Sequence, residues 1–255
     1  MLLEGKVCVI TGGGSGIGEV TAGRFAAEGA IVFIADIDKR ESARAAEEIT
    51  KKHGASAAYA IAADVSSEPA VQSLVAAVVK LAGKVDVLFN NAAAILPKPL
   101  EEVAEHEWTR LVDINLKSVY LTTKHSIPWL RQTKGCIVNM ASLNGLTGQK
   151  QNAAYAATKG GIIAMTKSLA LDYAADGVRV NCICPAGVMT PLLEQWILKQ
   201  DDPAAARIAL NDMHALGRPA QAEEIADAAL FLASGQSQFI TGVALPVDGG
   251  ASLGY

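Results

Sequence analysis

Two hydrophobic patterns alternate along the whole chain. Short runs that are apolar at nearly every position predict strands at residues 6–11, 31–36, 57–62, 85–90, 136–141, 179–184 and 243–247. Such runs are typical of parallel strands that are covered on both faces. Longer segments with helical spacing predict helices at residues 16–28, 40–53, 68–82, about 105–132 and about 152–175. This alternation predicts an α/β fold, a doubly wound parallel sheet of about seven strands with helices on both faces.

The alternation is interrupted once, between residues 185 and 219. Residues that usually interrupt helices surround a short amphipathic stretch at 192–199; they are Pro185, Gly187, Pro191, Pro203 and Gly217. We expect this substrate-loop insertion, at about residues 186–217, to form a lid over a substrate. No linker, repeat or low-complexity segment occurs elsewhere, so the sequence predicts one domain over residues 1–255.

Composition and charge exclude several classes of protein. The 255 residues are 51% hydrophobic and 19% charged, which is incompatible with intrinsic disorder. A net charge of −4 and a pI near 5.6 argue against nucleic acid or an anionic membrane surface as the main partner. No apolar run approaches the roughly 20 residues that span a bilayer. Residues 1–10 have the pattern of a strand rather than of a signal peptide, so we expect a cytoplasmic protein.

The four cysteines and four histidines do not indicate a metal site. Cys8, Cys136, Cys182 and Cys184 lie in predicted strands without a Cys-x-x-Cys spacing, and the histidines fall elsewhere at no ligand spacing. We interpret the cysteines as buried structural thiols and expect no bound metal.

A glycine-rich loop follows the first predicted strand and opens the first predicted helix. From Thr11 to Gly18 it reads Thr-Gly-Gly-Gly-Ser-Gly-Ile-Gly. Glycines let backbone N–H groups approach a pyrophosphate, and the positive end of the helix faces that charge. In this position the loop predicts a Rossmann-like dinucleotide site, whose contacts we expect from Gly12, Ser15, Gly16, Ile17 and Gly18.

Polar residues end the next predicted strands, where the same cofactor would lie. Asp36 ends the second strand, and an acid about 20 residues beyond the glycine loop binds the adenosine ribose hydroxyls. Its carboxylate would repel a 2′-phosphate, so NAD is expected rather than NADP. Lys39 and Arg40 open an exposed helix and receive less weight. The other contacts expected on this side are Ile37, Asp64, Val65, Asn91 and Ala92.

Candidate catalytic groups follow the fifth predicted strand. Ser142 ends that strand, and Tyr155 and Lys159 stand four residues apart in the next helix, so their side chains share one face. A tyrosine, with an ordinary pKa of about 10, is a poor base at neutral pH, and a nearby ammonium lowers that pKa. We expect Lys159 to act on Tyr155 in this way while Ser142 holds the substrate oxygen.

Together these motifs resemble the classical short-chain dehydrogenase/reductase family over essentially the whole chain. Besides the loop and the candidate catalytic groups, the matches are Asn115 in Asp-Ile-Asn-Leu, Asn181 with Pro185, Thr190, and residues 247–250. The resemblance implies a catalytic set of Asn115, Ser142, Tyr155 and Lys159. It also implies further cofactor contacts from Tyr155, Lys159, Pro185, Val188 and Thr190.

The mechanism that the resemblance implies is hydride transfer between a secondary alcohol and nicotinamide C4 of NAD. Tyr155 would take the alcohol proton, Lys159 would bind the nicotinamide ribose, and Asn115 would hold a water that relays the proton. Two positions depart from the family pattern: Ala93 and Ala186 stand where the family has glycine. Neither departure removes a catalytic group, but both affect the expected shape of the cofactor pocket.

The sequence defines the substrate less closely. The C-terminal third is similar to the branch of L-fucose and 17β-hydroxysteroid dehydrogenases, at residues 177–182, 190–192, 202–203 and 253–255. Asn144, Gln149 and Gln151 suit a sugar or another small hydroxylated alcohol better than a steroid, although such amides also serve as loop hydrogen-bonders. A 3-oxoacyl-thioester reductase and a non-catalytic NAD-binding regulator remain alternatives. The resemblance further implies a homotetramer, or a homodimer, built on the two long helices and the last strand.

Overall fold

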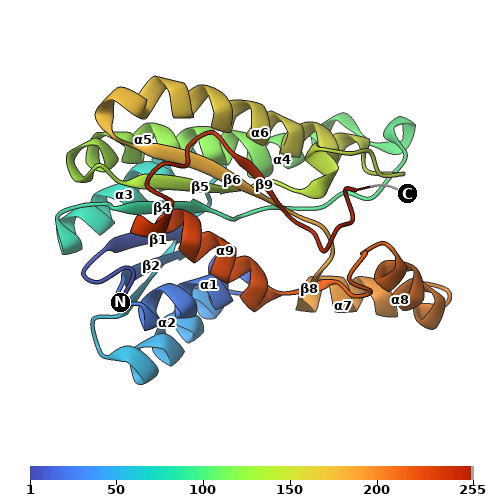
Figure 1. Ribbon diagram of the computed structural model, residues 1–255, viewed down its shortest axis with the longest axis horizontal. Coiled ribbons are helices and arrows are strands. Elements are labelled where there is room, and N and C mark those ends of the chain that lie inside the picture. Colours follow the sequence, from blue (N-terminus) through green and yellow to red (C-terminus); the bar gives the residue numbers. More distant parts are fainter. Residues whose placement is uncertain (254–255) are drawn as a thin grey trace.

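The computed structural model describes residues 1–253, without the side chain of Leu192. Gly254 and Tyr255, part of the segment similar to the fucose and steroid branch, lie outside the described residues. The centre of the molecule is a parallel sheet of seven strands in the order β3-β2-β1-β4-β5-β6-β9 (Figure 1). These strands are β1 (Val7–Thr11), β2 (Ile31–Asp36), β3 (Ala58–Ala62), β4 (Val87–Asn90), β5 (Cys136–Met140), β6 (Arg179–Pro185) and β9 (Ala244–Val247).

Helices cover both faces of the sheet (Figure 1). One face carries α1 (Gly16–Ala27), α2 (Lys39–His53) and α9 (Ala222–Ala233). The other carries α3 (Glu68–Ala82), α4 (Glu105–Val112), α5 (Ser118–Thr133) and α6 (Ala153–Tyr173). Both faces of β1 are buried, because Cys8 and Ile10 join one hydrophobic core while Val7 and Val9 join the other. The predicted doubly wound fold is confirmed, and all four cysteines are free and buried.

The helix predicted at 105–132 is not continuous. A π-helical turn over Asp113–Lys117 separates α4 from α5. A π-turn inserts one residue into the helical spacing, and such turns are frequent at functional sites. Here the turn contains the fully buried Asn115. Hydrophobic periodicity did not reveal this break.

The segment after β6 lies beyond the carboxyl ends of the strands, at the right of Figure 1. It contains β7 (Val188–Met189), α7 (Pro191–Leu198), α8 (Pro203–Asp212) and β8 (Ala220–Gln221), and β7 pairs with β8 in parallel. The interpretation of Pro191 and Pro203 as interruptions was wrong, because each opens a helix. Proline fits the first helical turn, where its missing N–H has no partner to lose. Thr190 and Asp202 cap these two helices through their side chains.

Within residues 1–253, no helix combines the length and the hydropathy needed to cross a membrane.

Candidate active site

The carboxyl ends of the strands and the segment from β7 to α8 enclose a cavity of about 950 Å³. Ligands of open α/β sheets bind at this edge of the sheet. The cavity brings together nearly all of the residues predicted from the sequence: Gly12, Ser15, Gly16, Ile17, Asp36, Ile37, Asp64, Val65, Asn91, Ala92, Ser142, Asn144, Gln149, Gln151, Tyr155, Lys159, Pro185, Val188 and Thr190. Two predicted residues, Gly18 and Asn115, do not line it.

The glycine loop has the conformation that its sequence predicts. Gly12 and Gly16 adopt φ values of 62° and 55°, which residues with a side chain rarely adopt. A Cβ at Gly12 would lie 2.8 Å from Ala92 Cα, so the loop presses directly against the chain that follows β4. A Cβ at Gly18 would collide with the Gly12 carbonyl oxygen. Gly18 therefore shapes the loop by close packing rather than by facing the cavity.

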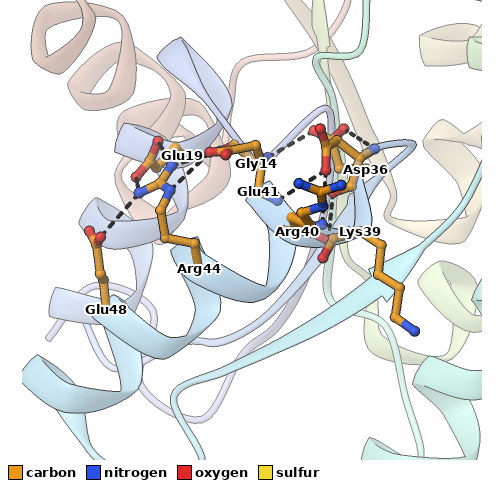
Figure 2. Close-up of polar contacts among 10 residues, drawn as sticks. Gly14, Glu19, Asp36, Lys39, Arg40, Glu41, Arg44 and Glu48 are labelled. Carbon is orange, nitrogen blue, oxygen red and sulfur yellow. Dashed lines mark hydrogen bonds and ion pairs between the residues drawn. The ribbon is translucent and has the colours of Figure 1, made fainter.

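Asp36 is held in place by two backbone groups at the end of β2 (Figure 2). Its Oδ2 accepts a hydrogen bond from Gly14 N at 2.9 Å, and its Oδ1 accepts one from Asp38 N at 2.9 Å. The carboxylate is thus tied to the glycine loop on one side and to the start of α2 on the other. Because both bonds orient it, the carboxylate is preorganised at the edge of the cavity.

Arg44 was not predicted as a site residue, yet it contacts the same loop. Its Nη2 donates to the Gly14 carbonyl oxygen at 3.1 Å, on the opposite side of that residue from Asp36 (Figure 2). The guanidinium is also paired with Glu19, Glu41 and Glu48 at 2.8–3.1 Å. Glu41 and Glu48, three residues before and four after Arg44, are its neighbours on the helix surface. This spacing is the sequence pattern from which two of the ion pairs could have been predicted.

The end of β3 supplies an ionised carboxylate to the cavity. A hydrogen bond from the Ser66 side chain, supported by the charge of Arg110, lowers the pKa of Asp64. Ser66 Oγ lies 2.6 Å from Asp64 Oδ1. Ser66 and Arg110 both line the cavity, although neither was predicted. Arg110 comes from α4, so only the tertiary structure brings it to this end.

The candidate catalytic side chains meet at the opposite end of the cavity. Burial raises the pKa of Tyr155 to about 12, and a hydrogen bond with the Ser142 side chain acts in the lowering direction. Lys159 is 1% exposed, and burial lowers its pKa to about 8. Its Nζ donates to the Met140 carbonyl oxygen at 2.7 Å. A Cβ at Gly145 would lie 2.8 Å from the Lys159 carbonyl carbon, so this glycine lets α6 approach the loop after β5.

The expectation that Lys159 lowers the pKa of Tyr155 in the protein alone is not met. The Lys159 ammonium lies 5.6 Å from the centre of the Tyr155 ring and gives a hydrogen bond to a backbone carbonyl instead. Removal from water favours the neutral phenol, and this effect is the larger one here.

Asn115 lies behind the cavity wall. Its Oδ1 accepts from Ala94 N at 2.7 Å, while its Nδ2 donates to the Ala94 carbonyl oxygen at 3.0 Å and to Thr158 Oγ1 at 3.1 Å. The side chain therefore joins the π-turn to the loop after β4 and to α6, one residue from Lys159. In this arrangement the amide fixes the walls of the site.

The amides proposed for the substrate form a cluster beside Tyr155. Gln149 Oε1 accepts from Asn144 Nδ2 at 2.6 Å and from Asn152 Nδ2 at 3.3 Å. Gln151, with a φ of 59°, also lines the cavity. Asn152 was not predicted. The segment from β7 to α8 adds an apolar wall that the sequence did not assign, formed by Leu193, Trp196, Leu210 and Met213.

A single cavity with a dinucleotide-binding loop at one end and a buried phenol and ammonium at the other defines an oxidoreductase. Comparison with known proteins agrees with this class. A family model described as enoyl-(acyl carrier protein) reductase matches residues 12–252. The chain belongs to the short-chain dehydrogenase/reductase family, as its motifs indicated.

Two relatives that match over nearly the full length are dehydrogenases of hydroxylated compounds. Meso-2,3-butanediol dehydrogenase of Serratia marcescens is 40% identical over 99% of this chain and 96% of its own. L-fucose dehydrogenase of Mus musculus is 40% identical over 99% of this chain and 90% of its own. This chain is accordingly an oxidoreductase of the same kind.

Solved structures give the same result. A structure of levodione reductase has a TM-score of 0.94 and 31% identity, covering 99% of this chain and 100% of the other. A 3-ketoacyl-(acyl-carrier-protein) reductase from Brucella melitensis, complexed with NADH, has a TM-score of 0.87 and 40% identity, covering 98% of this chain and 99% of the other. The second of these structures contains NADH, which confirms the prediction that this family of homologues uses NAD(H).

Proposed function

We propose that this protein is an NAD-dependent dehydrogenase of a small hydroxylated secondary alcohol, with Ser142, Tyr155 and Lys159 as its catalytic groups and Asn115 as the residue that positions the walls around them. The observation that carries the proposal is that Tyr155 and Asp36 line one cavity, at ends that suit the nicotinamide and the adenosine ribose. Residues 186–217 would serve as the substrate lid, because four of their side chains form its apolar wall.

Proton transfer is assigned to Tyr155. Bound NAD⁺ supplies the hydride acceptor and a positive charge beside the phenol. With a pKa raised to about 12, Tyr155 is protonated at neutral pH in the protein alone. The Ser142 hydrogen bond and the charge of the Lys159 ammonium both favour the phenolate, so together they would prepare Tyr155 to accept the alcohol proton. In the reverse direction the protonated phenol is ready to donate to a ketone.

Selection of NAD over NADP is assigned to Asp36 and supported by Arg44. The oriented Asp36 carboxylate can accept hydrogen bonds from both ribose hydroxyls and would repel a 2′-phosphate. Arg44 is the cation bonded to the glycine loop, and its three glutamate partners hold it away from the ribose position. Its guanidinium therefore supports the loop rather than attracting a phosphate.

The substrate we propose is a sugar or diol with both hydroxyl and apolar parts. Gln149 uses its amide oxygen within the cluster, so its N–H groups are the part that can donate to a substrate hydroxyl. The facing wall from the lid, which includes Trp196 and Met213, suits the carbon skeleton of such a molecule. Butanediol and fucose, the substrates in the names of two relatives, both have this character.

A second candidate is reduction of a 3-oxoacyl thioester. A 3-oxoacyl-[acyl-carrier-protein] reductase of Thermotoga maritima is 38% identical over 98% of this chain and 99% of its own. The protonated Tyr155 would suit ketone reduction. Against it, a net charge of −4 disfavours docking of an acidic carrier. A regulator without catalysis is disfavoured because Tyr155 and Lys159 both face the cavity.

The test is a substrate panel measured by NADH absorbance. Meso-2,3-butanediol, L-fucose and cyclopentanol would be supplied with NAD⁺, and a 3-oxoacyl thioester with NADH or NADPH. We expect turnover of a hydroxylated alcohol with NAD⁺. Faster reduction of the thioester would replace the proposal with the second candidate, and tight NAD binding without any turnover would favour the regulator.

We also propose a cytoplasmic homotetramer. The four cysteines of the chain are free and buried, which suits a reducing compartment such as the cytoplasm.

The proposed assembly rests on large apolar side chains that are exposed on α6 and in the loop before β9: Leu171 is 81% exposed and Phe239 is fully exposed. Along α6, Ala157 and Ala164 share a face with Leu171 at seven-residue spacing, which permits close approach of a second helix.

A further inference from the structure

His214 is a buried histidine that the catalytic set does not use. It lies in the turn between α8 and β8 and is 3% exposed. Its Nε2 lies 3.2 Å from Gly187 N, and its Nδ1 lies 2.8 Å from the Leu210 carbonyl oxygen. One ring therefore contacts both the last turns of the lid helix α8 and the loop that leads from β6 to β7.

The two partners determine the protonation state of this ring. A backbone N–H can only donate, so Nε2 must be the acceptor for Gly187. A carbonyl oxygen can only accept, so Nδ1 must carry the proton that is donated to Leu210. The neutral Nδ1–H tautomer is the form that satisfies both bonds, and it leaves neither ring nitrogen unpaired in the interior.

Both backbone polar groups of Gly187 form hydrogen bonds with residues between 214 and 220. Its N–H donates to His214, and its carbonyl oxygen accepts from Ala220 N at 2.9 Å. A Cβ at Gly187 would lie 2.9 Å from Leu210 Cδ1 and 3.1 Å from His214 Cε1, so a side chain here would push against the ring. The family motif has a glycine directly after Pro185. In this chain the glycine follows one place later, at a position where a side chain would press against the imidazole.

The ring lies directly behind the wall of the substrate cavity. Gly187, Leu210 and Met213 line that cavity, and His214 bonds the first two and follows the third in sequence. On its other side the same turn is bonded to the last segment of the chain, through Leu216 N and the Gly249 carbonyl oxygen at 3.0 Å. The imidazole is therefore the junction between the lid and the loop beside the nicotinamide end.

We propose that His214 is a positioning residue for substrate binding. It sets the distance between the lid wall at Leu210 and Met213 and the loop at Gly187, and so fixes the width of the substrate end of the cavity. The inference rests on the proposed function, because it assigns the lid to the alcohol substrate. Asp36 lies at the other end of the cavity, but Pro185 and Val188, on either side of Gly187, are expected cofactor contacts, so the KM of NAD is measured beside that of the alcohol.

The experiment compares His214→Leu with His214→Gln. Leucine removes both bonds and leaves the Gly187 N–H buried without a partner, whereas the glutamine amide oxygen can still accept from it. We expect His214→Leu to raise the KM of the alcohol about tenfold, with a smaller rise in the KM of NAD and kcat changed less than about twofold, and His214→Gln to stay within about threefold of wild type. His125→Gln, at a half-buried histidine paired with Glu68 on α3, is the matched control and should leave all three constants unchanged.

A second readout is independent of turnover. Hydrogen exchange at the Gly187 amide should be slow in the wild type, faster in His214→Leu and restored in His214→Gln. If His214→Leu fails to fold, Gly187→Ala tests the junction from the other side and should raise the alcohol KM in the same way. An unchanged alcohol KM in a folded variant, or a KM rise that glutamine does not rescue, overturns the inference. A wild-type protein that oxidises no alcohol would instead overturn the proposed function, while the exchange result would still decide the role of His214.

Discussion

The ammonium of Lys159 lies 5.6 Å from the centre of the Tyr155 ring and donates to a backbone carbonyl rather than to the phenol oxygen. Both side chains are removed from water, and burial shifts their pKa values in opposite directions, upward for Tyr155 and downward for Lys159. Each group is thus held nearer to its neutral form than it would be in water.

Replacement of Tyr155 by phenylalanine should abolish turnover and spare cofactor binding. The change removes only the oxygen that exchanges a proton with the substrate and keeps the ring volume. We expect kcat to fall at least about 100-fold, within the range of positioned acid–base catalysis. The dissociation constant of NAD, measured by titration, should change less than about twofold. Tyr59→Phe, at a ring stacked on Phe33 in the core, is the control. A variant that keeps more than about a tenth of the wild-type rate would remove Tyr155 from its assigned role.

Replacement of Lys159 by methionine should change the pH dependence of stability. In the folded protein the pKa of Lys159 is about 8, below its ordinary value of 10.5. Between those values the unfolded chain binds more protons, so the free energy of unfolding rises with pH through this window. Below it, the charged ammonium costs about 3 kcal/mol of stability.

Lys159→Met should therefore be the more stable protein at neutral pH, by up to about 3 kcal/mol, and should lack this rise. Urea unfolding at several pH values between about 7 and 10 measures both effects. Parallel curves for the wild type and the variant would show that burial does not lower the Lys159 pKa.

Cofactor preference should depend on Asp36. Like charges about 4 Å apart repel by roughly 4 kcal/mol at an effective dielectric near 20, and screening reduces this repulsion to about half. We expect a ratio of kcat/KM for NAD over NADP of roughly 30 to 150 in the wild type. In Asp36→Ala the ratio should fall at least tenfold, mainly through weaker use of NAD. Equal efficiencies in the wild type would mean that Lys39 or Arg40 reaches the 2′-phosphate.

Arg44 should affect NAD binding more than stability. Its side chain is 39% exposed, and ion pairs at such positions contribute about 1 kcal/mol or less. Its bond to the Gly14 carbonyl oxygen, however, supports the loop that Asp36 holds from the other side. Arg44→Met should raise the KM of NAD severalfold and leave kcat unchanged. Arg24→Met is matched in exposure and loses two ion pairs, against three for Arg44, but away from the glycine loop, so its KM for NAD should stay at the wild-type value. Equal effects of the two substitutions would reduce Arg44 to a surface ion pair.

Oligomerisation should require the exposed apolar surface of α6. Leu171→Glu places a charge in the proposed helix contact, where it would be costly to bury. Light scattering at micromolar concentration should give the mass of a tetramer for the wild type and a smaller species for the variant. A wild-type monomer would refute the assembly.

The sequence by itself determined the elements that local pattern controls. Continuous apolar runs specified the strands, because both faces of this sheet are covered, and the glycine loop specified its own turn through residues that need positive φ. Tyr155 and Lys159 could be paired because helical spacing places them on one face. Asp36 could be assigned because it follows a strand whose carboxyl end meets the loop.

Only the tertiary structure decided which distant groups meet. Arg44 reaches Gly14, Arg110 approaches Asp64, and His214 bonds Gly187 across segments that local periodicity cannot connect. Sequence reasoning also missed the π-turn at Asn115 and the helix that begins at Pro203. The π-turn is determined by packing, and the start of the helix depends on a single capping residue. The direction of the Tyr155 pKa shift follows the same rule. Spacing shows that a lysine is near, but burial, which only the folded chain creates, determines the stronger effect.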